Sequence, residues 1–154
     1  MEPGELYWTV IEPHWNRVTI YEGGDSFLRE YTRTPEVARN LLSAHWCQSE
    51  VCNGGLHQFF FNPTGVLAPE AVVGYEAIGL PGLGSVVRRA IIFFGPPYPR
   101  EQERRQQALD KHAEAHPFAW DPFEKLNDEF FDLLKDEGGG WASAADEYAK
   151  QHRP

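Results

Sequence analysis

Proline residues mark the starts of helices at four places in this chain. Glutamate follows within two residues of Pro35, Pro69, Pro99 and Pro122. Proline is favoured at the first helical position because its missing N–H would have no partner there and its φ is already helical. Apolar residues recur at helical spacing after most of these starts. The pattern predicts helices over 35–52, 69–78, 99–113 and from 121 onward.

Glycine and proline also indicate where helices end. Gly79 and Pro81 are expected to end the second of these helices, and the three glycines at 138–140 are expected to end the fourth. Between them, the apolar run at 85–94 is typical of a buried helix. No long linker and no internal repeat interrupts the series.

The N-terminal part is less regular but rich in aromatic residues. Residues 7–15 and 27–31 have apolar side chains at helical spacing, while 18–21 is compatible with a short strand. No run alternates regularly enough for a sheet. We predict an all-α fold, a single compact multi-helix domain with at most a short N-terminal β element. Within this domain of 1–154 we expect an aromatic-rich element over 1–33, a helical core over 34–137, and a glycine hinge with a short C-terminal helix over 138–154.

The charge of the chain restricts its partners. The formal net charge is −9, whereas direct nucleic-acid binders normally carry a basic field because phosphate contacts supply most of their affinity. The charge therefore argues against direct binding of nucleic acid or of an anionic membrane. We see no signal-peptide pattern and no apolar run that approaches a membrane span, so a cytoplasmic location is expected. Cys47 and Cys52 are predicted to stay reduced.

The most distinctive motif lies at residues 49–62, where a helix runs into two glycines and then a dense aromatic cluster. Glycine tolerates positive φ, so Gly54 and Gly55 are expected to break one helix and start the next. Asn53 is a candidate cap for the second helix, and the Gln58 amide a candidate partner for backbone groups at the break. We interpret the motif as structural, with a polar ligand pocket at the break as the alternative. The residues concerned are Glu50, Asn53, Gly54, Gly55, His57, Gln58, Phe59, Phe60 and Asn62.

Here the sequence resembles a family of small acidic proteins named for a DNA-mimic member. The likeness lies in the Asn-Gly-Gly-x-x-Gln-aromatic-aromatic-x-Asn motif at 53–62, the Ala-Pro-Glu-Ala segment at 68–71 and the Ile-Gly pair at 78–79, and it extends over about 35–134. The resemblance implies an all-helical fold. The member for which the family is named is described as a dimer that occupies the DNA-binding surface of a transcription factor, so the resemblance also implies a candidate role of this kind. Surface carboxylates are not part of the motif, so a binding surface has to be sought among the acids themselves.

Acidic residues gather late in the chain. Residues 110–147 hold eleven acids and three lysines. Four of these acids recur every four residues opposite an apolar stripe, so their carboxylates follow one another at about 6 Å along one helix face. Such a row suits a basic groove, although a charged helix face can also serve solubility alone. The partner-binding residues predicted on this helix are Glu124, Asp128, Glu129, Asp132, Asp136 and Glu137.

A basic strip in the middle of the chain provides an opposite pole. This strip is a candidate partner for the acidic helix of a second copy, which would form a homodimer. The aromatic residues around Trp8 and Trp15 are candidates for an apolar interface in such a dimer. Nearby acids of the same chain are the alternative partners. The strip consists of Arg88, Arg89, Arg100, Arg104 and Arg105.

The motifs of common enzyme classes are missing from the sequence. His112 and His116 have the spacing of a zinc-binding pair, but Pro117 follows at once and no glutamate follows the first histidine. No nucleophile elbow and no nucleotide-binding loop is found. We therefore predict no catalytic residue, no metal and no cofactor.

These observations favour a non-enzymatic acidic protein-binding module. Its expected partner is another protein with a basic surface, such as a transcription factor or a toxin. Two alternatives stay open: an immunity or inhibitor protein that neutralises a toxin or enzyme, and a small-molecule or enzymatic pocket at the helix break.

Overall fold

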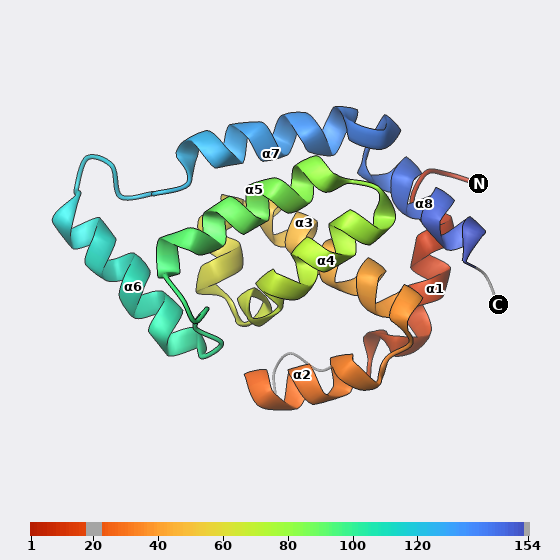
Figure 1. Ribbon diagram of the computed structural model, residues 1–154, viewed down its shortest axis with the longest axis horizontal. Coiled ribbons are helices and arrows are strands. Elements are labelled where there is room, and N and C mark those ends of the chain that lie inside the picture. The colour runs from red at the N-terminus through yellow and green to blue at the C-terminus, as the bar shows by residue number, and fades with distance from the viewer. Residues whose placement is uncertain (18–22, 153–154) are drawn as a thin grey trace.

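The computed structural model describes residues 1–17 and 23–152, and within them it contains eight α-helices and no strand (Figure 1). The predicted all-α class is confirmed. The strand considered at 18–21 lies outside the described residues. The helices are α1 (Glu5–Trp15), α2 (Gly24–Arg33), α3 (Glu36–Phe61), α4 (Ala68–Ile78), α5 (Pro81–Ile91), α6 (Gln102–Ala115), α7 (Glu124–Asp136) and α8 (Trp141–Gln151), with short 3-10 turns at Pro63–Leu67, Ile92–Phe94 and Glu137–Gly139.

Proline lies near each predicted helix start, though not always at the first helical position. Pro69 lies in the first turn of α4, as predicted. Pro81 belongs to the first turn of α5, so the helix expected at 85–94 starts earlier, and Gly79 alone ends α4. Helix α6 begins three residues after Pro99, and helix α7 begins two residues after Pro122.

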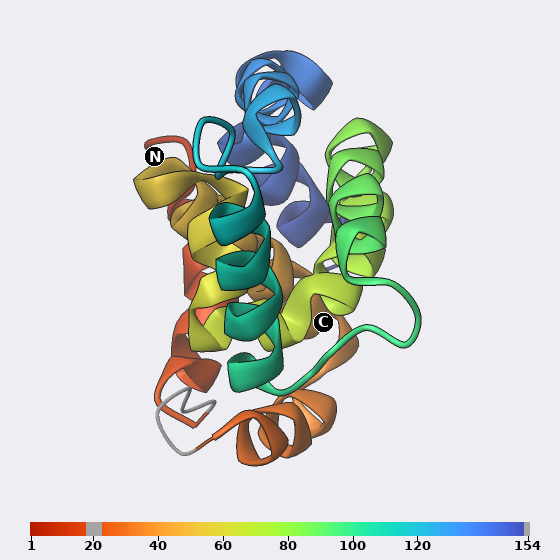
Figure 2. The same ribbon diagram turned by 90° about the vertical axis from the view of Figure 1, so that its left-hand side faces the viewer.

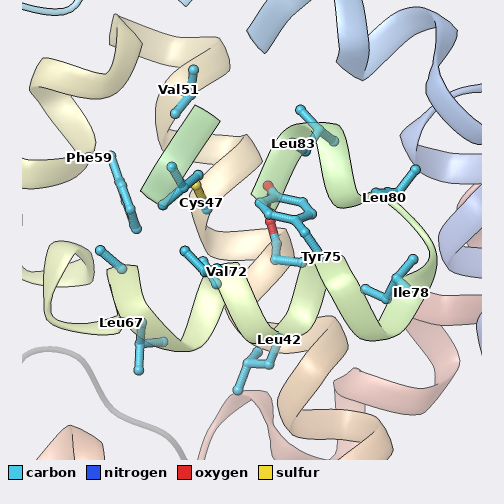
Figure 3. Close-up of a cluster of buried hydrophobic side chains, with 14 of the residues drawn as sticks. Leu42, Cys47, Val51, Phe59, Leu67, Val72, Tyr75, Ile78, Leu80 and Leu83 are labelled. Atoms are coloured by element: carbon cyan, nitrogen blue, oxygen red, sulfur yellow. Dashed lines mark hydrogen bonds between the residues drawn. The ribbon is translucent and has the colours of Figure 1, made fainter. Parts of the chain in front are cut away.

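Helix α3 is central and packs against α1, α4, α6 and α7. Helix α4 crosses it closely at Gly74, where a Cβ atom would come within 2.5 Å of the carbonyl oxygen of Asn40. Next to this crossing the hydroxyl of Tyr75 donates a hydrogen bond to the carbonyl oxygen of Ala44 at 2.9 Å. Figure 3 shows apolar side chains of α3, α4 and α5 gathered around Tyr75. This cluster forms the middle of the core.

Helices α6 and α7 lie on the outside of the molecule (Figures 1 and 2). Helix α7 packs against α3 and α5, while α6 packs against α3. Phe123 and Phe130 are fully buried beneath α7. One face of α7 is therefore fixed to the core and the opposite face is left to solvent.

Helices α1 and α8 pack against each other, so the first and last helices of the described chain are neighbours (Figure 1). Asp146 of α8 accepts hydrogen bonds from the N–H groups of Gly4 at 2.7 Å and Tyr7 at 2.9 Å. The first N–H groups of a helix lack partners within the helix, so this carboxylate stabilises the start of α1. The C-terminal helix is thus joined to the N-terminal one.

The N-terminal aromatic residues surround one histidine. The rings of Trp8 and Trp15 lie 5.5 Å from that of His45, and Trp15 stacks on Trp46 at 4.6 Å. The hydroxyl of Tyr7 lies 2.9 Å from Nδ1 of His45. Burial among these rings lowers the pKa of His45 to about 4. Trp8 and Trp15 are half-buried against the core, so they pack within the fold instead of forming a free apolar surface.

Candidate protein-binding surface

The helix break predicted at the Asn-Gly-Gly motif is present within α3. Gly54 (φ −156°) and Gly55 (φ 76°, ψ 179°) leave the helical conformation, while helix continues on both sides. Residues with a side chain rarely adopt the conformation of Gly55. A Cβ atom there would also lie 3.1 Å from the side-chain nitrogen of Asn127 on α7. Both the backbone angle and the close approach of α7 therefore favour glycine.

The polar residues of the motif bind one another across the break. The amide groups of Gln58 and Asn62 each donate a hydrogen bond of 2.9 Å to the same carboxylate oxygen of Glu50. On the other side of the helix Phe59 and Phe60 are fully buried. Hydrogen bonds on one side and packing on the other hold the two halves of α3 at their angle.

The cap of the second half of α3 comes from α7. The side-chain oxygen of Asn127 accepts a hydrogen bond from the Leu56 N–H at 2.9 Å. The amide nitrogen of Asn127 lies 3.3 Å from a carboxylate oxygen of Asp121. Asn53, which we expected to cap this helix, is instead exposed. That expectation was wrong because the cap is supplied by a residue far away in the sequence.

Two hollows flank the break. One of about 500 Å³ is lined by residues that include Asn53, His57 and Gln58, and one of about 380 Å³ is lined by residues that include Glu50 and Cys52. Both are open to solvent. Because Glu50 and Gln58 already bind each other, the polar groups that a ligand would need are engaged. The geometry gives the pocket alternative little support.

The acidic row on α7 is exposed along its whole length. Glu124, Asp128, Asp132 and Asp136 are all exposed. Among the described residues, none of these four carboxylates forms an ion pair or a hydrogen bond. They therefore present a line of unneutralised charge on a helix whose other face is buried.

Two of the six acids predicted to bind a partner are engaged within the protein. The Glu129 carboxylate accepts two hydrogen bonds from Arg89, at 2.9 and 2.5 Å, which lower the pKa of Glu129. Glu137 accepts hydrogen bonds from the N–H groups of Gly82 at 2.6 Å and Leu83 at 3.0 Å, at the start of α5. Both side chains join α5 to the acidic helix or to the turn after it. We therefore exclude them from the candidate surface.

The five arginines expected to form a basic strip do not act as one surface. Arg88 pairs with Glu76, and Arg100 binds Glu70 at 2.5 and 3.1 Å. Arg104 is exposed. Intramolecular pairing, one of the alternatives considered from the sequence, thus accounts for most of the strip.

Arg105 is fully buried without a carboxylate partner. Its guanidinium donates hydrogen bonds to the carbonyl oxygens of Phe60 at 2.8 Å, Asn62 at 2.9 Å, Arg100 at 2.6 Å and Pro99 at 3.2 Å. Desolvation lowers the pKa of Arg105. Arg105 thus joins α6 to the end of α3 and to the turn before α6.

The surroundings of the histidine pair and of the two cysteines do not indicate a metal site. The rings of His112 and His116 stack at 4.3 Å, and His116 Nδ1 lies 3.1 Å from the carbonyl oxygen of His112. In the part of the chain that the structure describes, no three His, Cys, Asp or Glu side chains come together as a metal site would require. Cys47 is buried and Cys52 is exposed, both as free thiols.

Sequence reasoning did not single out three residues at this surface. Asn127 lies within the acidic helix but serves the helix break, and nothing in its local sequence indicates that contact. Phe118 and Trp120 lie in the connection before α7 and are exposed. Both were available in the sequence as aromatic residues between Pro117 and Pro122, a position typical of a loop.

The fold and this surface define a small all-α acidic protein with one exposed carboxylate row. Across residues 1–17 and 23–152, no helix has the length and apolarity that crossing a membrane requires. The chain belongs to the DMP19-like protein family, whose model matches residues 32–152. This match includes the range of the resemblance noted in the sequence and continues through α8. No curated protein and no solved structure matches the chain.

Proposed function

We propose that this protein is a non-enzymatic protein-binding module whose α7 occupies a basic, nucleic-acid-binding surface on another protein. The observation that supports the proposal is the row of four exposed carboxylates, Glu124, Asp128, Asp132 and Asp136, which have no partner among the described residues. Membership in the DMP19-like protein family is compatible with a DNA-mimic role of this kind.

The helix that carries the row is held in place before any partner arrives. Asn127 bonds it to α3, Glu129 bonds it to α5, and Phe130 is buried beneath it. A preformed surface loses little conformational entropy on binding. Like charges four residues apart also repel by a few tenths of a kcal/mol per pair, and a basic partner relieves that repulsion. Association should be fast and sensitive to salt.

The test compares two variants of equal charge. One carries Asp128→Asn, Asp132→Asn and Asp136→Asn, and the control carries Glu2→Gln, Glu12→Gln and Glu103→Gln, which are exposed acids away from α7. Partners are captured from native lysate at low and high salt and identified. The strongest of them is then purified, and its nucleic-acid binding is measured with each variant added.

The wild type and the control should capture the same partner at low salt, lose it at high salt, and compete with its nucleic acid. The triple Asn variant should neither capture this partner nor compete with its nucleic acid. Equal capture and equal competition by the two variants would contradict the proposal. A captured partner that has a toxic activity, blocked by the wild type, would instead favour the immunity-protein alternative.

A further inference from the structure

The connection between α6 and α7 exposes two aromatic rings next to the acidic helix. Phe118 is fully exposed (103%) and Trp120 is 51% exposed, whereas Phe59, Phe60 and Phe123 are almost completely buried. Exposing such large apolar side chains to water is unfavourable. Aromatic residues left at the surface are typical of contact sites for other proteins.

Hydrogen bonds and packing hold this connection. The Ala119 N–H donates to the carbonyl oxygen of His116 at 3.0 Å, and the Ala119 carbonyl oxygen lies 3.1 Å from Nε2 of His112. The Trp120 ring meets the His57 ring edge-on at 5.1 Å. The two exposed rings are thus presented by a fixed backbone, and Trp120 links them to the helix break.

Acidic residues lie close to these rings along the chain, since Asp121 directly follows Trp120. Burial lowers the pKa of His57, the residue that Trp120 contacts, although the nearby charges of Asp121 and Asp110 oppose this shift. The exposed Glu124 follows at the start of α7. Within the described residues the cation–π pair is that of Arg100 and Tyr98, in another part of the molecule. Neither Phe118 nor Trp120 therefore has a cation over its ring in the described part of the chain, while Asp121 and Glu124 follow within four residues of Trp120.

We propose that Phe118 and Trp120 bind arginine side chains of an arginine-rich segment of the partner protein. A guanidinium group stacks flat on an aromatic face and interacts with nearby carboxylates at the same time, whereas a lysine ammonium is more strongly hydrated and does not stack. Asp110, Asp121 and Glu124 supply the negative charge that complements this segment. The inference rests on the proposed function, since it names the residue type that the partner brings to the acidic surface.

The test uses two short peptides of defined chemistry. One alternates arginine with glycine, and the other has lysine in place of arginine. Binding to the full chain is measured by fluorescence anisotropy at fixed salt. One double variant, Phe118→Leu with Trp120→Leu, keeps apolar side chains but removes the aromatic faces. A second, Phe118→Tyr with Trp120→Tyr, keeps the aromatic faces.

The wild type should bind the arginine peptide more tightly than the lysine peptide. The Leu pair should weaken binding of the arginine peptide by roughly fivefold or more, while the Tyr pair retains it. A control with Val73→Ala and Ile92→Ala, two other exposed apolar residues, should bind as the wild type does. Thermal unfolding of each variant establishes that the fold is kept.

Three results would overturn the inference: equal affinity for the two peptides, unchanged affinity in the Leu pair, or self-association of the wild type that the Leu pair abolishes, which would make a second copy the occupant. The triple Asn variant of α7 separates this inference from the proposed function. If it loses both peptides while the Leu pair binds normally, the proposed function survives and the inference fails. If the Leu pair alone loses the arginine peptide, the inference holds and the role of the α7 row fails.

Discussion

The side-chain oxygen of Asn127 accepts a hydrogen bond from the Leu56 N–H at 2.9 Å, and so joins the acidic helix to the break in α3. Gly55 leaves space for this contact, because a Cβ atom there would lie 3.1 Å from the Asn127 side chain. The break and the acidic row are therefore parts of one unit. The Asn-Gly-Gly motif therefore helps to fix the position of α7.

Asn127→Ala should destabilise the protein by about 1 kcal/mol, since it removes a helix cap. Urea unfolding measures this loss, and hydrogen exchange of the Leu56 amide should become faster. Asn53→Ala is the matched control, because Asn53 is exposed and caps nothing. Equal destabilisation by the two variants would mean that Asn127 does not cap the second half of α3.

Glu137→Ala should destabilise the protein by about 1–2 kcal/mol, because the N–H groups of Gly82 and Leu83 lose their acceptor. The neighbouring change Asp136→Asn removes an exposed charge from the row and should leave unfolding within about 0.5 kcal/mol of the wild type. Urea unfolding of both variants tests the division of the acids into structural and surface groups. A stable Glu137→Ala variant would contradict it.

Arg105→Met should destabilise the protein by about 3 kcal/mol or more, because four carbonyl oxygens lose a buried donor. The exposed Arg104 provides the control, and Arg104→Met should change the free energy of unfolding by about 0.5 kcal/mol or less. Chemical denaturation distinguishes the two. Little loss in Arg105→Met would mean that these carbonyl oxygens find other donors.

His45 should make the protein less stable in acid. Its pKa in the folded protein is lowered to about 4 by burial, whereas an unfolded histidine titrates near 6.5. Between these two pH values, the unfolded chain therefore binds a proton that the folded protein does not bind. The contribution of neutral His45 to the free energy of unfolding is fully present above about pH 6.5, and it is lost as the pH falls from about 6.5 to about 4.

The loss should be on the order of 2–3 kcal/mol, and below about pH 4 it should not grow further. Urea unfolding across this range measures it. His45→Gln should have a shallower pH dependence over the same interval, because glutamine does not titrate. A slope equal to that of the wild type would show that other groups cause the acid sensitivity.

Local patterns predicted much of the helical structure. Proline indicated helix starts to within three residues, the glycine pair marked the break in α3, and four acids spaced every four residues marked an exposed face. Each of these features depends on backbone geometry or on helical periodicity, which act over a few residues. They can therefore be read without knowing what packs where. Pro81 was assigned the wrong role, since it begins α5 and does not end α4.

The sequence by itself determined that the chain is helical, that α3 breaks at Gly54 and Gly55, and that α7 carries a row of carboxylates. Only the tertiary structure decided that Asn127 caps α3, that Glu129 and Glu137 are engaged with α5, and that Phe118 remains exposed. These outcomes depend on contacts between residues that lie 40 to 71 positions apart, or on the lack of such contacts. The spacing of residues in a sequence indicates the period of a helix, but it does not indicate which residue of another helix will lie across a packed interface.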